Sequence, residues 1–167
     1  MDTLAPAPAP TPTPAPAPAC RHSRIRVETR RSTEFIDLTD RIAASVSDTG
    51  IRDGLVTIHT LHTTTAILVN EHEPLLLADF AALLERLAPQ HARYRHDDMT
   101  ERTMNLAPGE RPNGHAHCRA LLLGGSASLN LSGGRLQLGR WQRVFLVELD
   151  GPRSREVSVQ VFGGIAR

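Results

Sequence analysis

Residues 56–71 read V-T-I-H-T-L-H-T-T-T-A-I-L-V-N-E, and this stretch decides the fold. Two apolar segments rich in β-branched residues, Val56–Ile58 and Ala66–Val69, surround a polar middle with two histidines and three successive threonines. Such residues favour pleated strands, so we predict a strand pair or one long interrupted strand. Polar groups at the centre of a packed strand break the hydrophobic pattern, which is typical of functional sites. The polar residues expected to contribute to a site are His62, Thr63, Thr64, Asn70 and Glu71.

The composition indicates one globular domain without a polyanionic partner. The chain has 167 residues, 40% of them hydrophobic, which is enough for one core. The formal net charge is only +1, and no basic stripe alternates with aromatic residues, so we expect no nucleic-acid binding. All 19 basic residues are arginine, which excludes a lysine Schiff base, a lysine general base and a Walker-type phosphate lysine. Arginine remains available to bind phosphates in bidentate fashion.

The location is expected to be cytoplasmic. Cys20 lies in a proline-rich region and Cys118 in an apolar run, so we predict no disulfide and a reducing compartment. No stretch approaches the roughly 20 apolar residues that a membrane helix needs, and we expect no membrane association. The N-terminus lacks the basic and apolar regions of a signal peptide.

The N-terminal segment is expected to stand apart from the domain. Residues Thr3–Ala19 alternate proline with alanine or threonine, which favours polyproline II and cannot build a core. We therefore predict a disordered or semi-stiff tail over residues 1–22 and one domain over residues 23–167. A passive tail is favoured over a docking segment.

The rest of the chain reads as strands and helices of an α+β domain. Ile25, Val27 and Thr29 alternate with charged residues, which predicts a half-exposed strand. Periodicity and helix signals predict helices over about Thr39–Asp48, Pro74–Leu87 and Gly114–Leu123. Further strands are expected at Ala127–Ser132, Leu136–Leu138, Val144–Leu149 and Val157–Phe162. We predict a single compact α+β domain with a mainly antiparallel β core and two or three helices.

Seven of the eight histidines lie between residues 59 and 117. No pair has the spacing of a standard zinc motif, and Cys-x-x-Cys is absent from the sequence. On the predicted helix, His115 and His117 point in nearly opposite directions, so at most one faces a shared site. A surface or hydrogen-bonded core position is the alternative for any single histidine.

Other polar groups lie in the predicted loop Gln90–Asn113, whose length is more typical of functional loops. Asp97 and Asp98 could bind a hard cation or orient His96, and a solvated turn is the alternative. Arg153 and Arg155 flank a turn and could bind anions, although pairing with Glu148 or Asp150 is the more common arrangement. The sequence contains neither a P-loop nor a Gly-x-Ser-x-Gly elbow.

Five short motifs occur in the order found in the YjbQ-like family, whose members are often labelled secondary thiamine-phosphate synthases. The resemblance covers about Arg24–Gly163. This chain differs from the family pattern in two places: a third threonine follows His62, and Arg140 stands where threonine is common. The motifs are His62-Thr63-Thr64 with Asn70-Glu71, Tyr94-Arg95-His96-Asp97-Asp98, Asn113-Gly114-His115-Ala116-His117, Leu138-Gly139-Arg140-Trp141-Gln142 and Glu148-Leu149-Asp150-Gly151-Pro152-Arg153.

The resemblance implies a homotrimer with a histidine-built site for a divalent metal ion, zinc or magnesium. It makes His62, His96 and His117 the expected ligands. Asn70, Glu71 and Asp97 are expected to orient ligands or to act as a base, together with Thr63 and Thr64 as catalytic residues.

The family label implies that a hydroxymethylpyrimidine diphosphate is joined to a thiazole phosphate with release of diphosphate, as a weak or secondary activity. A small phosphorylated metabolite is thus the expected partner, and a cation or arginine would stabilise the leaving group. The alternatives are a metal-dependent hydrolase and a non-enzymatic trimeric module that binds a metal or ligand.

Overall fold

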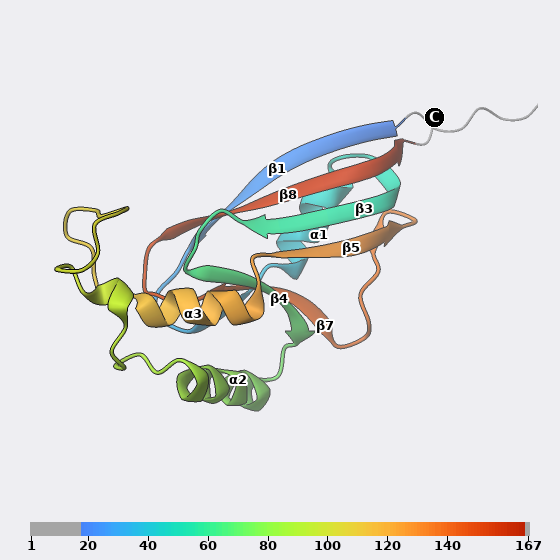
Figure 1. Ribbon diagram of the computed structural model, residues 1–167. Coiled ribbons are helices and arrows are strands. Elements are labelled where there is room, and N and C mark those ends of the chain that lie inside the picture. The colour runs from blue at the N-terminus through green and yellow to red at the C-terminus, as the bar shows by residue number, and fades with distance from the viewer. Residues whose placement is uncertain (1–17, 166–167) are drawn as a thin grey trace, which may run out of the picture.

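The computed structural model describes residues 18–165, and it contains two antiparallel sheets and three α-helices in that range (Figure 1). The larger sheet has the order β1-β8-β3-β5-β6 and the smaller one β2-β7-β4. This arrangement confirms the predicted α+β domain with a mainly antiparallel core. The strands are β1 (Pro18–Glu28), β2 (Glu34–Asp37), β3 (Ile51–Thr60), β4 (Thr65–Glu71), β5 (Ser126–Ser132), β6 (Arg135–Leu136), β7 (Gln142–Glu148) and β8 (Ser154–Ile165).

The opening stretch forms two strands that belong to different sheets. β3 pairs with β8 and β5, whereas β4 pairs with β7. On β3, Val56 and Ile58 are buried and Thr57 is exposed, which is the expected alternation of a half-buried strand. Residues 61–64, of which 62–64 are polar, form the short connection by which the chain passes from one sheet to the other. Their polarity is thus that of a connection between two sheets and not of a strand centre.

The three predicted helices are confirmed as α1 (Thr39–Ser47), α2 (Pro74–Leu87) and α3 (Gly114–Leu123). Helix α1 begins where the Asp37 carboxylate accepts the Thr39 backbone N–H at 2.9 Å. Helix α2 has proline in its first turn and is capped by the Glu73 carboxylate, which accepts two backbone N–H groups. Helices α2 and α3 lie on the same side of the smaller sheet in Figure 1.

Strand β7 joins two hydrophobic cores. Val144 and Leu146 pack in the main core between the larger sheet and α1, and Phe145 and Val147 pack in a second core against α2 and α3. All four side chains are fully buried. A strand covered on both faces reads as a continuous apolar run, which is the pattern of residues 144–147.

Strands β3 and β8 approach closely at a pair of glycines. Gly54 and Gly163 are register partners beside a bulge in β3. A Cβ on Gly54 would lie 2.0 Å from the Phe162 carbonyl oxygen, and one on Gly163 would lie 2.1 Å from the Asp53 carbonyl oxygen. Only glycine fits at both positions.

The described part of the chain begins with β1 at Pro18, five residues before the predicted domain start at Ser23. Residues 18–22 pair with residues 160–164 of β8 and belong to the larger sheet. Proline is tolerated there because β1 is an edge strand. Residues 1–17 of the tail predicted for residues 1–22 lie outside the described residues.

Candidate functional site

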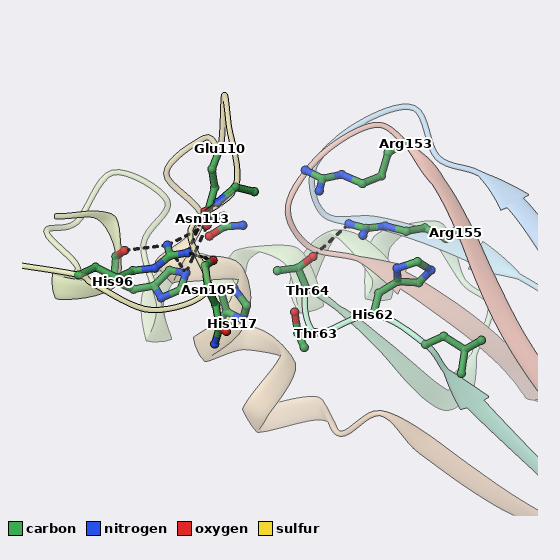
Figure 2. Close-up of a pocket in the computed structure, with 13 residues that line it drawn as sticks. His62, Thr63, Thr64, His96, Asn105, Glu110, Asn113, His117, Arg153 and Arg155 are labelled. Atoms are coloured by element: carbon green, nitrogen blue, oxygen red, sulfur yellow. Dashed lines mark hydrogen bonds and ion pairs between the residues drawn. The ribbon is translucent and has the colours of Figure 1, made fainter. Parts of the chain in front are cut away.

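A polar cavity of about 580 Å³ lies where the connection between β3 and β4 meets the start of α3. The loop between α2 and α3 and the residues around the start of β8 complete its walls. Figure 2 shows a histidine pair on one side and two arginines on the other. The cavity is lined by Leu61, His62, Thr63, Thr64, His96, Arg102, Asn105, Ala107, Glu110, Asn113, His117, Arg153 and Arg155.

Five of the eight predicted site residues line this cavity, namely His62, Thr63, Thr64, His96 and His117. They come from three separate segments, as the sequence analysis expected. His115, by contrast, is buried on the other side of α3, which agrees with the opposite directions predicted for His115 and His117.

Asp97 supports the site from outside its lining. Its Oδ1 accepts the backbone N–H groups of Asn113 and Gly114 at 2.8 and 2.9 Å. The carboxylate therefore caps the N-terminus of α3, where it also favours the helix dipole. The predicted role of Asp97 as a base or orienting residue stays a prediction, and the contact that the geometry gives is this cap.

The structure places Asn70 and Glu71 away from the cavity. They end strand β4, where they pair with Arg143 and Gln142, whereas Thr65 begins the strand beside the cavity. Five residues of strand span about 16 Å, so neither side chain belongs to this site. Asn70 and Glu71 were expected near His62 because they follow it closely in the sequence. In an extended strand, however, each residue adds about 3.3 Å of distance.

The loop between α2 and α3 is organised by the guanidinium of Arg102. It forms a bidentate ion pair with Glu110, with both N···O distances 2.8 Å. It also donates to the Asn105 carbonyl oxygen at 2.6 Å and lies 3.2 Å from Nε2 of His96. A guanidinium has no acceptor, so Nε2 of His96 must be the acceptor in that contact. One side chain thereby orders the loop and orients His96.

The three histidines expected to bind one metal ion do not converge. The rings of His96 and His117 meet edge to face, with centroids 4.6 Å apart, and His62 lies across the cavity in Figure 2. Nε2 of His62 accepts the backbone N–H of Glu156 at 2.8 Å. Within residues 18–165 no group of three His, Cys, Asp or Glu side chains is placed to hold a metal ion. As placed within one chain, the three rings therefore do not surround a common point, and no chemical step is derived through a metal ion.

The environment keeps two of these imidazoles neutral at pH 7. Burial lowers the pKa of His117 below its usual 6.5, and the neighbouring His96 lowers it further. Burial and then the Arg155 guanidinium lower the pKa of His62. No hydrogen bond from the His117 ring occurs within the described residues, so its lone pair is available to take a proton.

A buried ion pair supports the opposite wall. Nε and Nη2 of Arg155 both donate to the Glu148 carboxylate at 2.6 Å, and these side chains are 3% and 0% exposed. Nη2 also donates to Oγ1 of Thr64 at 3.1 Å. Burial raises the pKa of Glu148, but Arg155 and the backbone N–H groups that follow Glu148 outweigh burial and hold that pKa below its usual range. The pair fixes Arg155 and Thr64 at the cavity.

The neighbouring Arg153 is paired with Asp150 at 2.6 Å. Both pairings agree with the arrangement that the sequence analysis gave for these arginines. Asp150 also accepts a hydrogen bond from Nδ2 of Asn113 at 3.3 Å. Sequence reasoning did not select Arg102, Asn105, Glu110 or Asn113 as site residues. Asn113 lay within a quoted motif, but the other three lay in a loop without periodicity.

The fold and this cavity are those of a small α+β protein with a histidine- and arginine-lined pocket. The sequence profile described as UPF0047 protein YjbQ-like matches residues 23–164, and the chain belongs to this family.

Relatives and solved structures agree with that assignment. A UPF0047 protein of Archaeoglobus fulgidus is 39% identical over 136 residues, which is 81% of this chain and 97% of the relative. One from Methanothermobacter thermautotrophicus is 37% identical over 137 residues, 82% and 88% of the two chains. The crystal structure of a YbjQ-like protein of unknown function from Sulfolobus solfataricus has a TM-score of 0.79 and 32% identity, covering 88% of this chain and 99% of that one. In residues 18–165, the helices are too short or too polar to cross a membrane.

Proposed function

We propose that the cavity is the active site of a group-transfer enzyme that acts on a small phosphorylated metabolite. One observation carries the proposal: an imidazole pair faces two arginines and two threonines across one cavity of about 580 Å³. Cavities of roughly 300–1,000 Å³ are usual for small-molecule sites. Groups that move protons and groups that bind anions thus face the same bound molecule.

His117 is the proposed general base or acid. Its lowered pKa leaves it neutral at pH 7, and its ring is free to exchange a proton with a bound molecule. His96 is a positioning residue in this proposal, because Arg102 occupies its Nε2 lone pair. The edge-to-face contact between the two rings holds His117 in place.

Family resemblance supports thiamine-phosphate synthesis, as a weak or secondary activity, as the particular reaction. In that reaction the thiazole nitrogen attacks the methylene carbon of the pyrimidine, and the C–O bond to diphosphate breaks with its electron pair going to diphosphate. The proton that His117 moves belongs to the pyrimidine amino group: His117 takes it as diphosphate leaves and returns it once the new C–N bond has formed. In this proposal Arg153 and Arg155, which line the cavity, stabilise the charge that develops on the leaving oxygen. The zinc or magnesium cofactor stays a prediction, tested by metal analysis of the purified protein and of His96→Ala and His117→Ala.

A homotrimer is the assembly that the resemblance implies, and exposed apolar side chains support an interface between copies. Trp141 is 60% exposed and Leu121 is 84% exposed. Light scattering on the purified chain should give three times the 18.2 kDa of one chain. A mass of one chain at micromolar concentration would contradict the trimer.

The activity is tested with hydroxymethylpyrimidine diphosphate and thiazole phosphate as substrates and thiamine phosphate as the measured product. His117→Ala should lower kcat about 100-fold or more, the usual contribution of a general base or acid. His91→Ala is the matched control, because His91 is exposed and lies outside the cavity. Equal rates for wild type and His117→Ala would refute the assignment. Rescue of a thiamine-phosphate synthase mutant by wild type but not by His117→Ala would support it in cells.

A further inference from the structure

One wall of the cavity consists of hydrogen-bond donors, and we call it the donor wall: His62, Thr63, Thr64, Arg153 and Arg155. His62 contributes through Nδ1. Since a backbone N–H can only donate, the bond from Glu156 places the lone pair of the neutral ring on Nε2 and its proton on Nδ1. Within the described residues, that Nδ1–H has no hydrogen-bond partner.

The arginines of the donor wall also keep unused donors. Arg155 uses Nε and Nη2 for Glu148 and Thr64, whereas its Nη1 makes no hydrogen bond among the residues described. Arg153 donates to Asp150 through Nη2 alone. The buried Glu148 holds Arg155 rigid, so the free N–H groups of Arg155 have a fixed direction before any ligand arrives.

The charge of the donor wall is nearly balanced. Glu148 offsets Arg155 and Asp150 offsets Arg153. A bound anion would thus be held by directed N–H and O–H groups more than by net charge, and exposed-charge attraction, which salt screens, would contribute little. The competing anion site, the N-terminus of α3, is already capped by Asp97.

We infer that the donor wall is a phosphoryl-binding subsite in which Nδ1–H of His62 and the free N–H groups of Arg155 and Arg153 hold the oxygens. This rests on the proposed function in that the phosphoryl group belongs to the metabolite on which His117 acts. It gives His62 a binding role in place of the expected metal ligation. It also places the phosphoryl group opposite the imidazole pair, across the cavity from His117.

Two substitutions of His62 separate its nitrogens. In His62→Asn the amide nitrogen lies near the position of Nδ1, so the donor toward the cavity is kept and the acceptor for Glu156 is lost. In His62→Gln the amide oxygen reaches the position of Nε2, so the acceptor is kept and the cavity donor is lost. Binding of inorganic phosphate is measured by titration calorimetry, and folding of each variant by circular dichroism. Arg135→Ala, an exposed arginine of β6, is the control.

We expect His62→Gln and Arg153→Gln to weaken phosphate binding roughly tenfold or more, the effect of one hydrogen bond to a charged group. His62→Asn should stay within about threefold of wild type while losing more thermal stability than His62→Gln. The wild-type Kd should change less than about threefold between low and moderate salt, because the donor wall is nearly neutral. Unchanged binding in His62→Gln, or equal loss in both His62 variants, overturns the subsite.

The two proposals fail separately. If phosphate binding follows the expected ranking but no thiamine phosphate forms, the phosphoryl subsite stands and the proposed reaction is wrong. If turnover depends on His117 while phosphate affinity is the same in wild type, His62→Gln and Arg153→Gln, the reaction stands and the subsite is wrong.

Discussion

Replacing Glu148 with glutamine should lower the free energy of unfolding by about 3–5 kcal/mol, the usual effect of removing one partner of a buried ion pair. The carboxylate has 0% exposure and binds Arg155 through both oxygens. Its Oε1 also accepts backbone N–H groups of residues 149–151, and its Oε2 accepts the Thr29 hydroxyl at 3.0 Å. The glutamine amide nitrogen would face donors on every side, and the Arg155 charge would remain buried without a partner.

The measurement is urea unfolding followed by circular dichroism at equal protein concentration, because assembly would make stability depend on concentration. A domain of this size loses about 2–4 °C of Tm per kcal/mol, so the variant should melt roughly 6–20 °C lower. Glu101→Gln is the control: it breaks the ion pair with Arg95, whose side chain is 90% exposed, and should change stability by less than about 1 kcal/mol.

The effect has a definite pH dependence. The pKa of Glu148 lies below the usual 4.5 in the folded protein, so its contribution is fully present above pH 4.5 and is lost as the pH falls through the folded pKa. The stability difference between wild type and Glu148→Gln should therefore shrink in acid. A loss below about 1 kcal/mol at pH 7, or a difference that grows in acid, would refute the reasoning.

Three further predictions concern other titratable groups. Burial raises the pKa of Asp37, yet hydrogen bonds from the start of α1 and from Arg143 hold it at about 2; its contribution of roughly 2 kcal/mol should be present above pH 3.8 and lost toward pH 2, and Asp37→Asn should flatten acid unfolding curves in that window. The acidic limb of kcat/KM should lie below pH 6.5, since the pKa of His117 is lowered, and His96→Ala should move the limb upward because His96 is one cause of that lowering; an unmoved limb would exclude His117 as the titrating group. Nε2 of His115 is buried without a hydrogen-bond partner among the described residues, so His115→Leu should raise the free energy of unfolding by about 1 kcal/mol in urea titrations, and a loss of more than 1 kcal/mol would show that the ring makes a contact that stabilises the fold.

The elements of the fold followed closely from local signals in the sequence. Helices α2 and α3 have the predicted bounds, because Pro74 begins one and Gly124 follows the other. Strand β1 was predicted too short, because residues 18–22 pair with β8 through backbone groups and carry no apolar alternation. Such backbone pairing depends on the partner strand, and no local sequence pattern predicts it.

The site was predictable only in part. His62, His96 and His117 were selected correctly as cavity residues, but their separation depends on how three segments meet in space. Asn70 was selected because it follows the histidine motif, and the extended β4 strand carries it away. Arg102 was not predicted as a site residue, because no sequence pattern marks it. Its long side chain connects the residues of its loop only once the loop has folded.

The glycine pair at the crossing of β3 and β8 restricts how this chain can vary over evolution. A Cβ at Gly54 or Gly163 would first meet a backbone carbonyl oxygen of the opposite strand, and at Gly163 it would also meet the Ile51 side chain. A second substitution elsewhere therefore cannot make room for alanine at the first position. Variation at this point requires a change of strand register, by an insertion or deletion at the β3 bulge. A single substitution of either glycine should be selected against.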